Sequence, residues 1–395
     1  MQKTKYEVML NKVPEVTIFF WIIKVLCTTV GETVSDFLNV TLGLGLNVTS
    51  VVMGVLLAVA LVFQFRAKKY MPGLYWMNVA LLSVFGTLVT DTLTDALGLP
   101  LEISTVGFSI CLLLTFLVWH HYEKTLSIHL IYTVRREAFY WLAILFTFAL
   151  GTASGDLMAE GLGLGYLPTG IIVCAVIICV GIGYKLGLDS VLSFWIAYIM
   201  TRPLGASLGD FLSQPKSNGG LGLGTTSTSV IFLAAILATV VFLIVTKKDI
   251  RELSTSDQMP TGETSSKSNR RVLIQTIAVI CILALLSGSG YVIRQASLAN
   301  NTNSSVSWSD MSQFVTIEED VLVLVNNGDF SAAKTRVKDL ETTWDQSAAV
   351  LKAADKERWK QADSGIDAVL HEIRAGKPDM DSSKIALENS MNMFK

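Results

Sequence analysis

Long apolar runs, separated by short polar linkers, dominate most of the chain. A helix needs about 20 mostly apolar residues to cross the hydrocarbon core of a bilayer. Nine runs reach roughly that length, at residues 15–38, 44–65, 74–96, 102–120, 138–160, 167–185, 188–212, 225–246 and 272–293. The pattern therefore predicts an all-α, polytopic membrane helical bundle.

The linkers divide the chain into four parts. Residues 1–246 hold eight of the runs, joined by alternately tiny and moderate linkers, and are expected to form four helical hairpins. Residues 247–271 are polar and rich in Ser and Thr, which is typical of a flexible linker. Residues 272–293 would be a ninth transmembrane helix. Residues 294–395 are polar with apolar positions at helical spacing, and they predict a small helical domain.

Basic residues set the orientation, because cytoplasmic loops carry an excess of Lys and Arg. One set of linkers carries almost all of them: Lys3, Lys5, Lys12, Arg66, Lys68, Lys69, Lys124, Arg135, Arg136, Lys185, Lys247, Lys248, Arg251, Lys267, Arg270 and Arg271. The opposite loops carry only Lys216. We expect the N-terminus and the 247–271 linker in the cytoplasm, and the domain at 294–395 outside the cell membrane.

Composition agrees with a membrane protein and excludes several other classes. Only 16% of the residues are charged, against about 25% in soluble domains, and the mean hydropathy is +0.51. The net charge of −2 gives no indication of nucleic-acid binding. The five Cys residues lie in apolar runs, which argues against a disulfide framework. No nucleotide-binding loop is visible, and no cofactor is expected beyond a divalent cation as cargo.

One motif recurs four times in the first helices of the expected hairpins. Small residues and a hydroxyl precede an acid in CTTVGE at 27–32, GTLVTD at 86–91, GTASGD at 151–156 and GASLGD at 205–210. A second polar residue follows each acid by four positions: Asp36, Asp95, Glu160 and Gln214. A Leu-Gly turn comes next in every copy. Because each repeat crosses the membrane twice, all four share one orientation, as in parallel duplication.

The spacing within the motif predicts a polar site between the four first helices. Small residues four apart form a close-packing seam, and acids four apart share one helix face. Acids within a membrane are costly and usually mark an ion path or a proton relay. The predicted metal ligands are Glu32, Asp36, Asp91, Asp95, Asp156, Glu160 and Asp210, with Thr28, Thr87, Thr152 and Ser207 nearby.

Two bases share one register within the repeats. Lys24 lies eight residues before Glu32, and Arg202 lies eight residues before Asp210. Each is interpreted either as a counter-ion for the acids or as a residue that couples transport to protons. Pro203 removes a backbone donor next to Arg202, so a kink or break is expected in that span.

The motif resembles a family of uncharacterised bacterial membrane-anchored proteins that is defined by this repeat and labelled as of unknown function. The resemblance covers roughly residues 15–246, through the acids Glu32, Asp91, Asp156 and Asp210. This chain departs from the pattern at Thr90, Ala206 and Gln214. The resemblance implies the bacterial cytoplasmic (inner) membrane and the same helical repeat, and it implies no substrate.

Secondary transport of a cation is the leading functional hypothesis. Carboxylate and hydroxyl oxygens suit hard divalent cations such as Mn²⁺ or Mg²⁺, and closely spaced acids suit proton coupling. Organic cations, including polyamines, remain open, because aromatic residues could line a larger cavity. These are Trp21, Trp76, Trp141 and Trp195.

Two other classes of function are less well supported by the sequence. A membrane sensor or interaction protein would use the exported domain, but no cytoplasmic signalling domain is visible. A membrane enzyme would need a nucleophile with its base or a metal-binding His cluster, and neither is found, so we expect no enzyme. The expected partners are the lipid bilayer and the cation. A homo-oligomer, or a periplasmic partner that binds residues 294–395, is left open.

Overall fold

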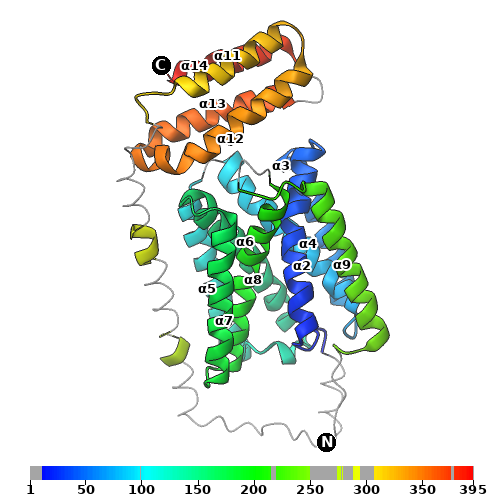
Figure 1. Cartoon of the computed structure of the whole chain (residues 1–395). Helices are drawn as coiled ribbons and strands as arrows, with labels where there is room; N and C mark the ends of the chain where they lie inside the picture. Colours follow the sequence, from blue (N-terminus) through cyan, green and yellow to red (C-terminus); the bar gives the residue numbers. More distant parts are fainter. Residues whose placement is uncertain are drawn as a thin grey trace, which may run out of the picture. The chain divides into compact units, whose positions relative to one another are not determined.

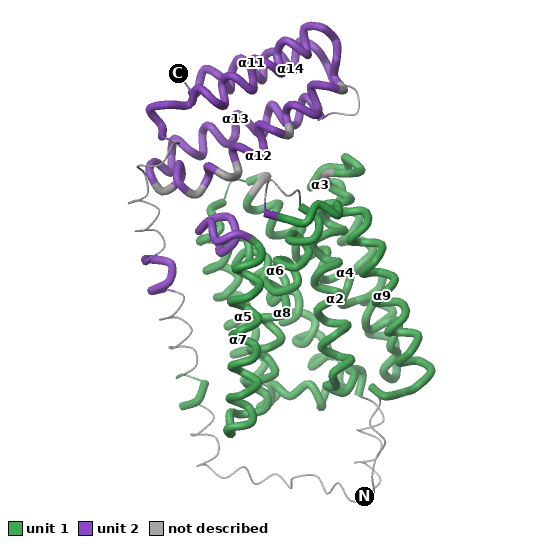
Figure 2. The backbone as a smooth tube through the Cα atoms, in the orientation of Figure 1, with its two compact units in different colours: residues 1–157, 166–215, 220–283 green, residues 158–165, 216–219, 284–395 purple. Residues whose placement is uncertain are grey.

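The computed structural model describes residues 11–97, 99–214, 219–249, 274–276, 278, 288–293, 307–374 and 378–394. The chain divides into two compact units, which are described separately (Figure 2). The membrane unit comprises residues 1–157, 166–215 and 220–283, and the second unit consists mainly of residues 284–395. Most of the linker expected at 247–271 and of the span expected at 272–293 lies outside the described residues.

In the part of the chain that the structure describes, the membrane unit contains eight long apolar helices (Figure 1). They are α2 (Ile18–Asp36), α3 (Leu46–Arg66), α4 (Pro72–Asp91), α5 (Leu101–Glu123), α6 (Val134–Asp156), α7 (Tyr166–Lys185), α8 (Ser190–Ser213) and α9 (Thr225–Thr246). Each is long and apolar enough to cross a bilayer. The first eight predicted spans are therefore confirmed as helices.

The first helices of the four repeats form a closed inner ring. Helix α2 packs on α4, α4 on α6, α6 on α8, and α8 returns to α2. The second helices lie outside the ring, with α3 on α4, α5 on α6, α7 on α8 and α9 on α2. Each second helix thus packs mainly against the next repeat rather than against its own partner in the hairpin, and α9 closes the circle on α2.

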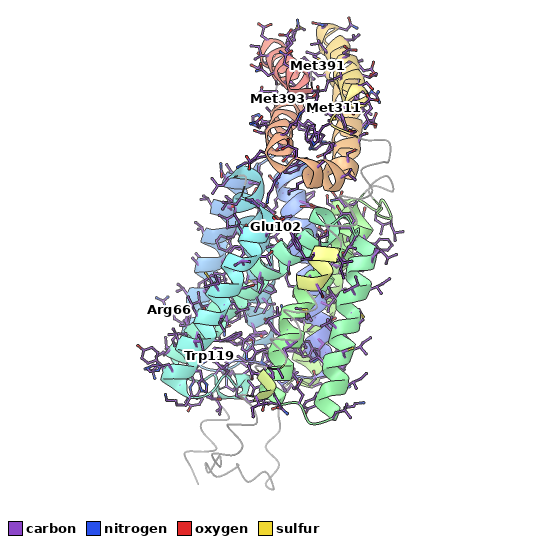
Figure 3. The ribbon with its side chains drawn as sticks, turned by 90° about the vertical axis from the view of Figure 1, so that its left-hand side faces the viewer. Arg66, Glu102, Trp119, Met311, Met391 and Met393 are labelled. Carbon is purple, nitrogen blue, oxygen red and sulfur yellow. The ribbon has the colours of Figure 1, made fainter. Side chains whose placement is uncertain are left out.

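Burial separates the two layers of helices. In the most apolar stretches of α2, α4, α6 and α8, 56–61% of the residues are buried, against 11–22% in α3, α5, α7 and α9. Polar residues inside a bilayer must be shielded from lipid, so a polar site is expected within the inner ring. Figure 3 shows the direction of α5 across the unit, with Glu102 toward one end and Trp119 toward the other, on the side of Arg66.

Glycines allow the inner helices to approach closely. A Cβ at Gly205 of α8 would overlap both the side chain and the backbone of Thr28 on α2. Gly151 of α6 faces the side chain of Arg202 in the same way, and Gly31 of α2 faces Ser83 on α4. The small-residue seam predicted from the repeat is therefore an interface between neighbouring members of the ring.

Substitution of Gly205 by alanine (G205A) should destabilise the membrane unit. The new methyl group would overlap Thr28, and overpacking of this kind typically costs about 1–3 kcal/mol. The matched control is G107A on the outer helix α5, because a Cβ there meets nothing within 4 Å. Thermal unfolding of both variants in detergent checks the expectation. Equal melting temperatures for G205A and the wild type would contradict the close packing.

The ends of the inner helices carry an unusual backbone feature. Helices α2, α4 and α6 continue directly into π-helical turns: η1 (Phe37–Thr41), η2 (Thr92–Ala96) and η4 (Leu157–Gly161). π-Helical turns are rare and frequently occur at functional sites. Leu-Gly turns precede the outer helices. Gly45 and Gly224 lie directly before α3 and α9, and their φ angles of 75° and 77° favour glycine.

The described residues between 307 and 394 form a bundle of four helices, so the domain predicted for 294–395 is confirmed as helical. Its helices are α11 (Ser312–Asn326), α12 (Phe330–Ala354), α13 (Lys356–Arg374) and α14 (Met380–Phe394). Each packs on the next, and α14 packs on α11. Phe314, Trp344 and Leu387 lie in its apolar core. Met311 and Met391 are buried with them, whereas Met393 is exposed (Figure 3).

A buried acid makes the stability of this bundle depend on pH. Glu318 is 0% exposed, and Oγ of Ser390 donates a hydrogen bond to its Oε1 over 2.5 Å. Burial raises the pKa of Glu318 from 4.5 to about 7. Between these values the folded bundle binds more protons than the unfolded chain. Its stability should therefore fall by up to about 3 kcal/mol as the pH rises from 4.5 through 7.

The variant E318Q should remove this dependence, because glutamine is neutral throughout the range. Residues 300–395, produced as a separate fragment, should melt cooperatively and at a lower temperature at pH 8 than at pH 5. The E318Q fragment should melt at similar temperatures at both pH values. E319Q, at the exposed neighbouring position, is the control and should behave like the wild type. A random-coil circular dichroism spectrum would show that the segment does not fold by itself.

Candidate functional site

The guanidinium of Arg202 joins all four inner helices. Arg202 lies on α8 and is 0% exposed. Its Nη2 donates hydrogen bonds to Oε2 of Glu32 over 2.6 Å, to Oγ1 of Thr152 over 2.7 Å, and to Oγ1 of Thr87. Its Nη1 donates to the backbone carbonyl of Thr28 over 3.1 Å. The four acceptors belong to α2, α4 and α6. Together with Arg202 they form the Arg202 site.

The repeat explains why these acceptors meet. Thr28, Thr87 and Thr152 hold the same position in the first three copies, and all three are 0% exposed. The fourth copy has Ala206 there, which leaves room beside the arginine's own helix. Breaking a buried ion pair by removing one partner typically costs about 3–5 kcal/mol. Removal of either Arg202 or Glu32 alone should therefore destabilise the folded membrane unit.

A second buried basic side chain lies in the same layer of the ring as Arg202. Lys24, Ser83, Phe148 and Arg202 hold equivalent positions in the four repeats, and all four are 0% exposed. Nζ of Lys24 lies 3.8 Å from the ring centroid of Phe148 and 4.0 Å from that of Tyr198. The Nζ atom has no hydrogen-bond partner in the described part of the chain. Two aromatic faces, rather than an acid, thus hold this ammonium.

The predicted acids differ widely in their surroundings. Glu32 and Asp210 are each 7% exposed, whereas Glu160 is exposed. Asp36, Asp91 and Asp156 are half-buried. The side chain of Asp95 lies outside the described residues. Among the residues described, no three His, Cys, Asp or Glu side chains are grouped so that they could hold a metal ion. The metal-ligand role of the seven acids thus stays a prediction.

Aromatic residues form a further layer that the sequence reasoning did not recognise as a repeat. Trp76, Trp141 and Trp195 are buried, each seven residues before the register position of its copy. Two buried tyrosines precede the first two of them, and the hydroxyls of Tyr75 and Tyr140 lie 2.5 Å apart. The recurring aromatic-Trp pairs at 75–76, 140–141 and 194–195 are the signal that would have found this layer.

A buried ion pair closes the end of the unit that carries the basic linkers. Nζ of Lys12 lies 2.7 Å from Oε2 of Glu137, and it also donates to the carbonyl of Phe65 over 3.0 Å. The amide of Gln64 donates to Oε1 of Glu137 over 3.1 Å. The segment before α2 is thereby tied to α3 and α6. Buried polar contacts thus hold the N-terminal segment against the helices at this end of the unit.

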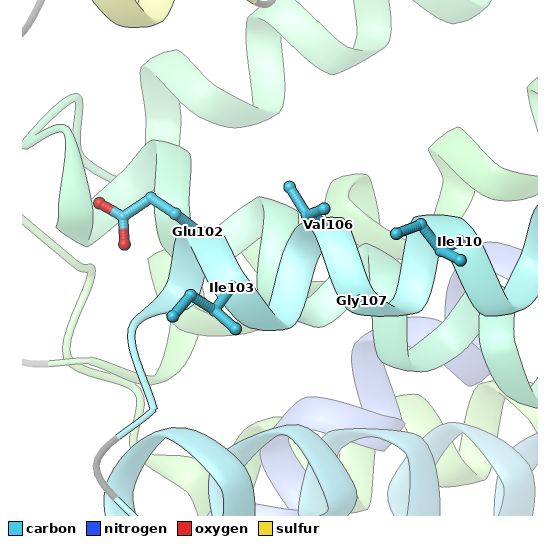
Figure 4. A pocket seen from close by; sticks show the side chains of 5 residues that line it. All are labelled: Glu102, Ile103, Val106, Gly107 and Ile110. Carbon is cyan, nitrogen blue, oxygen red and sulfur yellow. The ribbon is translucent and has the colours of Figure 1, made fainter.

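A hollow of about 400 Å³ runs along the outer helix α5 and is lined by Glu102, Ile103, Val106, Gly107 and Ile110 (Figure 4). Three of these side chains, Ile103, Val106 and Ile110, are more than half exposed. The hollow is part of the outer, apolar layer of helices. It is separate from the Arg202 site and adds no polar cluster to it.

Comparison with known proteins supports the repeat and assigns no activity. A protein-family model described as Repeat of Unknown Function (DUF347) matches residues 19–70, 74–125, 139–186 and 193–249. Each match contains one inner helix and the outer helix that follows it. No curated protein and no solved structure matches the chain. Any function must therefore be argued from the geometry of the ring.

Proposed function

Since the chain belongs to the family of this repeat of unknown function, we propose from its own geometry that the membrane unit is a secondary transporter for a cation. One observation carries the proposal. The buried Arg202–Glu32 pair, at 2.6 Å, lies where the four inner helices meet. Ionisable residues inside a membrane protein are costly and mark substrate or ion pathways by default.

The mechanism that we propose is an exchange of cations at Glu32. Arg202 occupies the carboxylate in the described state, and the cargo replaces it in another. Lys24 is the other buried basic residue of the inner helices, and we assign it the proton that is exchanged for the cargo. Pro203 lies inside α8 directly after Arg202, where it removes a backbone hydrogen bond and allows α8 to bend.

The proposal includes an orientation and two classes of cargo. The distribution of Lys and Arg supports a cytoplasmic N-terminus and an exported C-terminal bundle in the bacterial cytoplasmic membrane. Mn²⁺ or Mg²⁺ is the cargo predicted from the seven acids, and an organic cation is the other class. The acids favour a metal ion and the aromatic residues favour an organic cation, so direct measurement of flux is the way to separate the two classes.

The test is flux into proteoliposomes. Fluorescent indicators would follow Mn²⁺, Mg²⁺ and protons, and labelled organic cations would be screened beside them. For the cargo found, E32Q should reduce flux at least 10-fold per folded molecule, and D91N, D156N and D210N should also reduce it if these acids share the path. E160Q, at an exposed acid, is the matched control and should have a milder effect.

The double variants give a second criterion. Residues that share a site couple, whereas distant residues have additive effects. The losses for E32Q and D210N should therefore combine less than additively. Folded variants at all four acids with undiminished flux would remove these residues from the transport path.

A further inference from the structure

We propose that the cargo is a small organic cation with a guanidinium or primary ammonium group, and that the Arg202 site is its receptor. This inference rests on the proposed transport function and narrows the class of substrate. Arg202 and Lys24 then act as built-in stand-ins. Each occupies a position that suits a cationic group of the cargo. Between transport cycles Arg202 neutralises the Glu32 carboxylate, and Lys24 fills the space between the two aromatic rings.

The acceptors of the Arg202 site match N–H donors better than a metal ion. The site offers one carboxylate, from Glu32, two hydroxyls, from Thr87 and Thr152, and the carbonyl of Thr28. A guanidinium presents five N–H donors in a plane, and in Arg202 the four acceptors bind those of Nη1 and Nη2, whereas Nε has no hydrogen-bond partner among the described residues. Divalent Ca²⁺ and Mg²⁺ need about six oxygen ligands, usually with more than one carboxylate from the protein or with substrate phosphates.

The surroundings of Lys24 provide a second and independent indication. Its ammonium is fully buried against the faces of Phe148 and Tyr198, at 3.8 and 4.0 Å, and Nζ has no hydrogen-bond partner among the described residues. Aromatic faces recognise organic ammonium groups through their quadrupole. The two ring faces themselves offer no oxygen ligand to a metal ion.

The two positions lie in the same layer of the ring, because Lys24 and Arg202 hold equivalent positions in their repeats. Tyr198 and Arg202 are four residues apart on α8, and therefore lie on the same face about 6 Å apart along the helix axis. A cargo that carries an ammonium and a guanidinium on one short chain would therefore offer one cationic group to each position. We therefore expect amino-guanidines and short diamines to bind more tightly than a simple guanidinium ion.

The ring also offers a way for Arg202 to move aside. Gly151 of α6 contacts the arginine side chain, and Gly155 of α6 lies against Pro203. The missing side chains at these glycines let α6 pack closely on α8 at the proline, where α8 lacks a backbone hydrogen bond and can bend. Cargo and Arg202 then compete for the Glu32 carboxylate, and the carboxylate is paired with a cation in both states.

Chemical rescue tests the receptor directly. In the full-length variant R202A, Glu32 and the hydroxyls lose their donor. Millimolar methylguanidinium should then raise the melting temperature of purified R202A in detergent, and agmatine should raise it at lower concentrations. Tetramethylammonium and NaCl, which lack N–H donors, should not. The double variant E32Q/R202A should show no rescue, because it lacks the carboxylate.

A flux measurement on the wild type completes the test. Radiolabelled agmatine should accumulate in proteoliposomes under a proton gradient, and unlabelled putrescine and guanidinium should compete with it. The variant T87V/T152V keeps both charges but removes two acceptors, and its half-saturation concentration for agmatine should rise at least 10-fold. This variant also keeps the proposal testable if R202A does not fold.

The possible outcomes separate this inference from the proposed function. Flux of Mn²⁺ or Mg²⁺ without any flux of agmatine or putrescine, and without rescue of R202A, would overturn the organic-cation cargo and leave cation transport standing. Absence of flux for every cation would overturn the proposed function itself. Agmatine flux that T87V/T152V leaves unchanged would overturn the assignment of the Arg202 site as the receptor.

Discussion

Replacement of Arg202 alone by methionine (R202M) should cost the membrane unit about 3–5 kcal/mol of stability, because it leaves the carboxylate of Glu32 buried without its cation. The double variant E32Q/R202M should be markedly more stable than R202M, since it removes both charges and keeps the shapes. Cargo flux should be lost in both. The loss of stability measures the structural contribution of the ion pair, and the loss of flux measures its contribution to transport.

Thermal unfolding in detergent of the wild type, E32Q, R202M and E32Q/R202M measures the coupling between the two residues. A coupling energy in the range of about 0.5–3 kcal/mol is typical of residues in contact. Additive losses would contradict a direct ion pair. A double variant that folds well and still transports cargo would show that the pair is no part of the transport mechanism.

Lys24 should behave in the opposite way when it is replaced by methionine (K24M). The ammonium is buried and makes no hydrogen bond within the described residues, so its removal should leave stability unchanged or raise it. Methionine has a similar length, and its sulfur packs well against aromatic rings. Proton-coupled flux should nevertheless fall at least 10-fold, because the group that exchanges the proton is gone.

Lys12, which is also buried among the described residues, offers a matched control for K24M. Lys12 is 7% exposed and pairs with Glu137 at 2.7 Å, so K12M should lower the melting temperature. The comparison of K24M with K12M, by thermal unfolding and by flux, separates a functional lysine from a structural one. A large loss of stability in K24M with normal flux in the remaining folded protein would contradict the role assigned to Lys24.

The sequence predicts the helices of the membrane unit well, because lipid imposes one simple requirement on each span. About 20 apolar residues suffice to identify a crossing helix, and the eight described helices fit the first eight predicted runs. The neighbours of each helix could not be predicted in this way. The short linkers suggested hairpins, yet each outer helix packs mainly against the following repeat, which depends on packing between helix faces that the linkers do not reveal.

The candidate site was predicted in its composition and only partly in its geometry. The shared register of Lys24 and Arg202, and the threonines beside Glu32, were visible in the repeat. Helical spacing shows which residues share a face, but not which face turns toward the centre of the ring. Asp91 and Asp156 are only half-buried, and a long arginine side chain takes the central position. Its reach across three helices cannot be derived from spacing along α8.

The closure of the ring by α9 on α2 has a consequence for how the protein is made. Helix α2 is the first of the described spans to leave the ribosome, and it carries both Lys24 and Glu32. The guanidinium that pairs with Glu32 follows 170 residues later, and the last neighbour of α2 follows later still. During synthesis α2 therefore lies in the membrane before α8 and α9, its later neighbours, have been made. Nascent chains released before α8 would expose two unmatched charges, and these are the chains that quality-control proteases of the membrane should recognise.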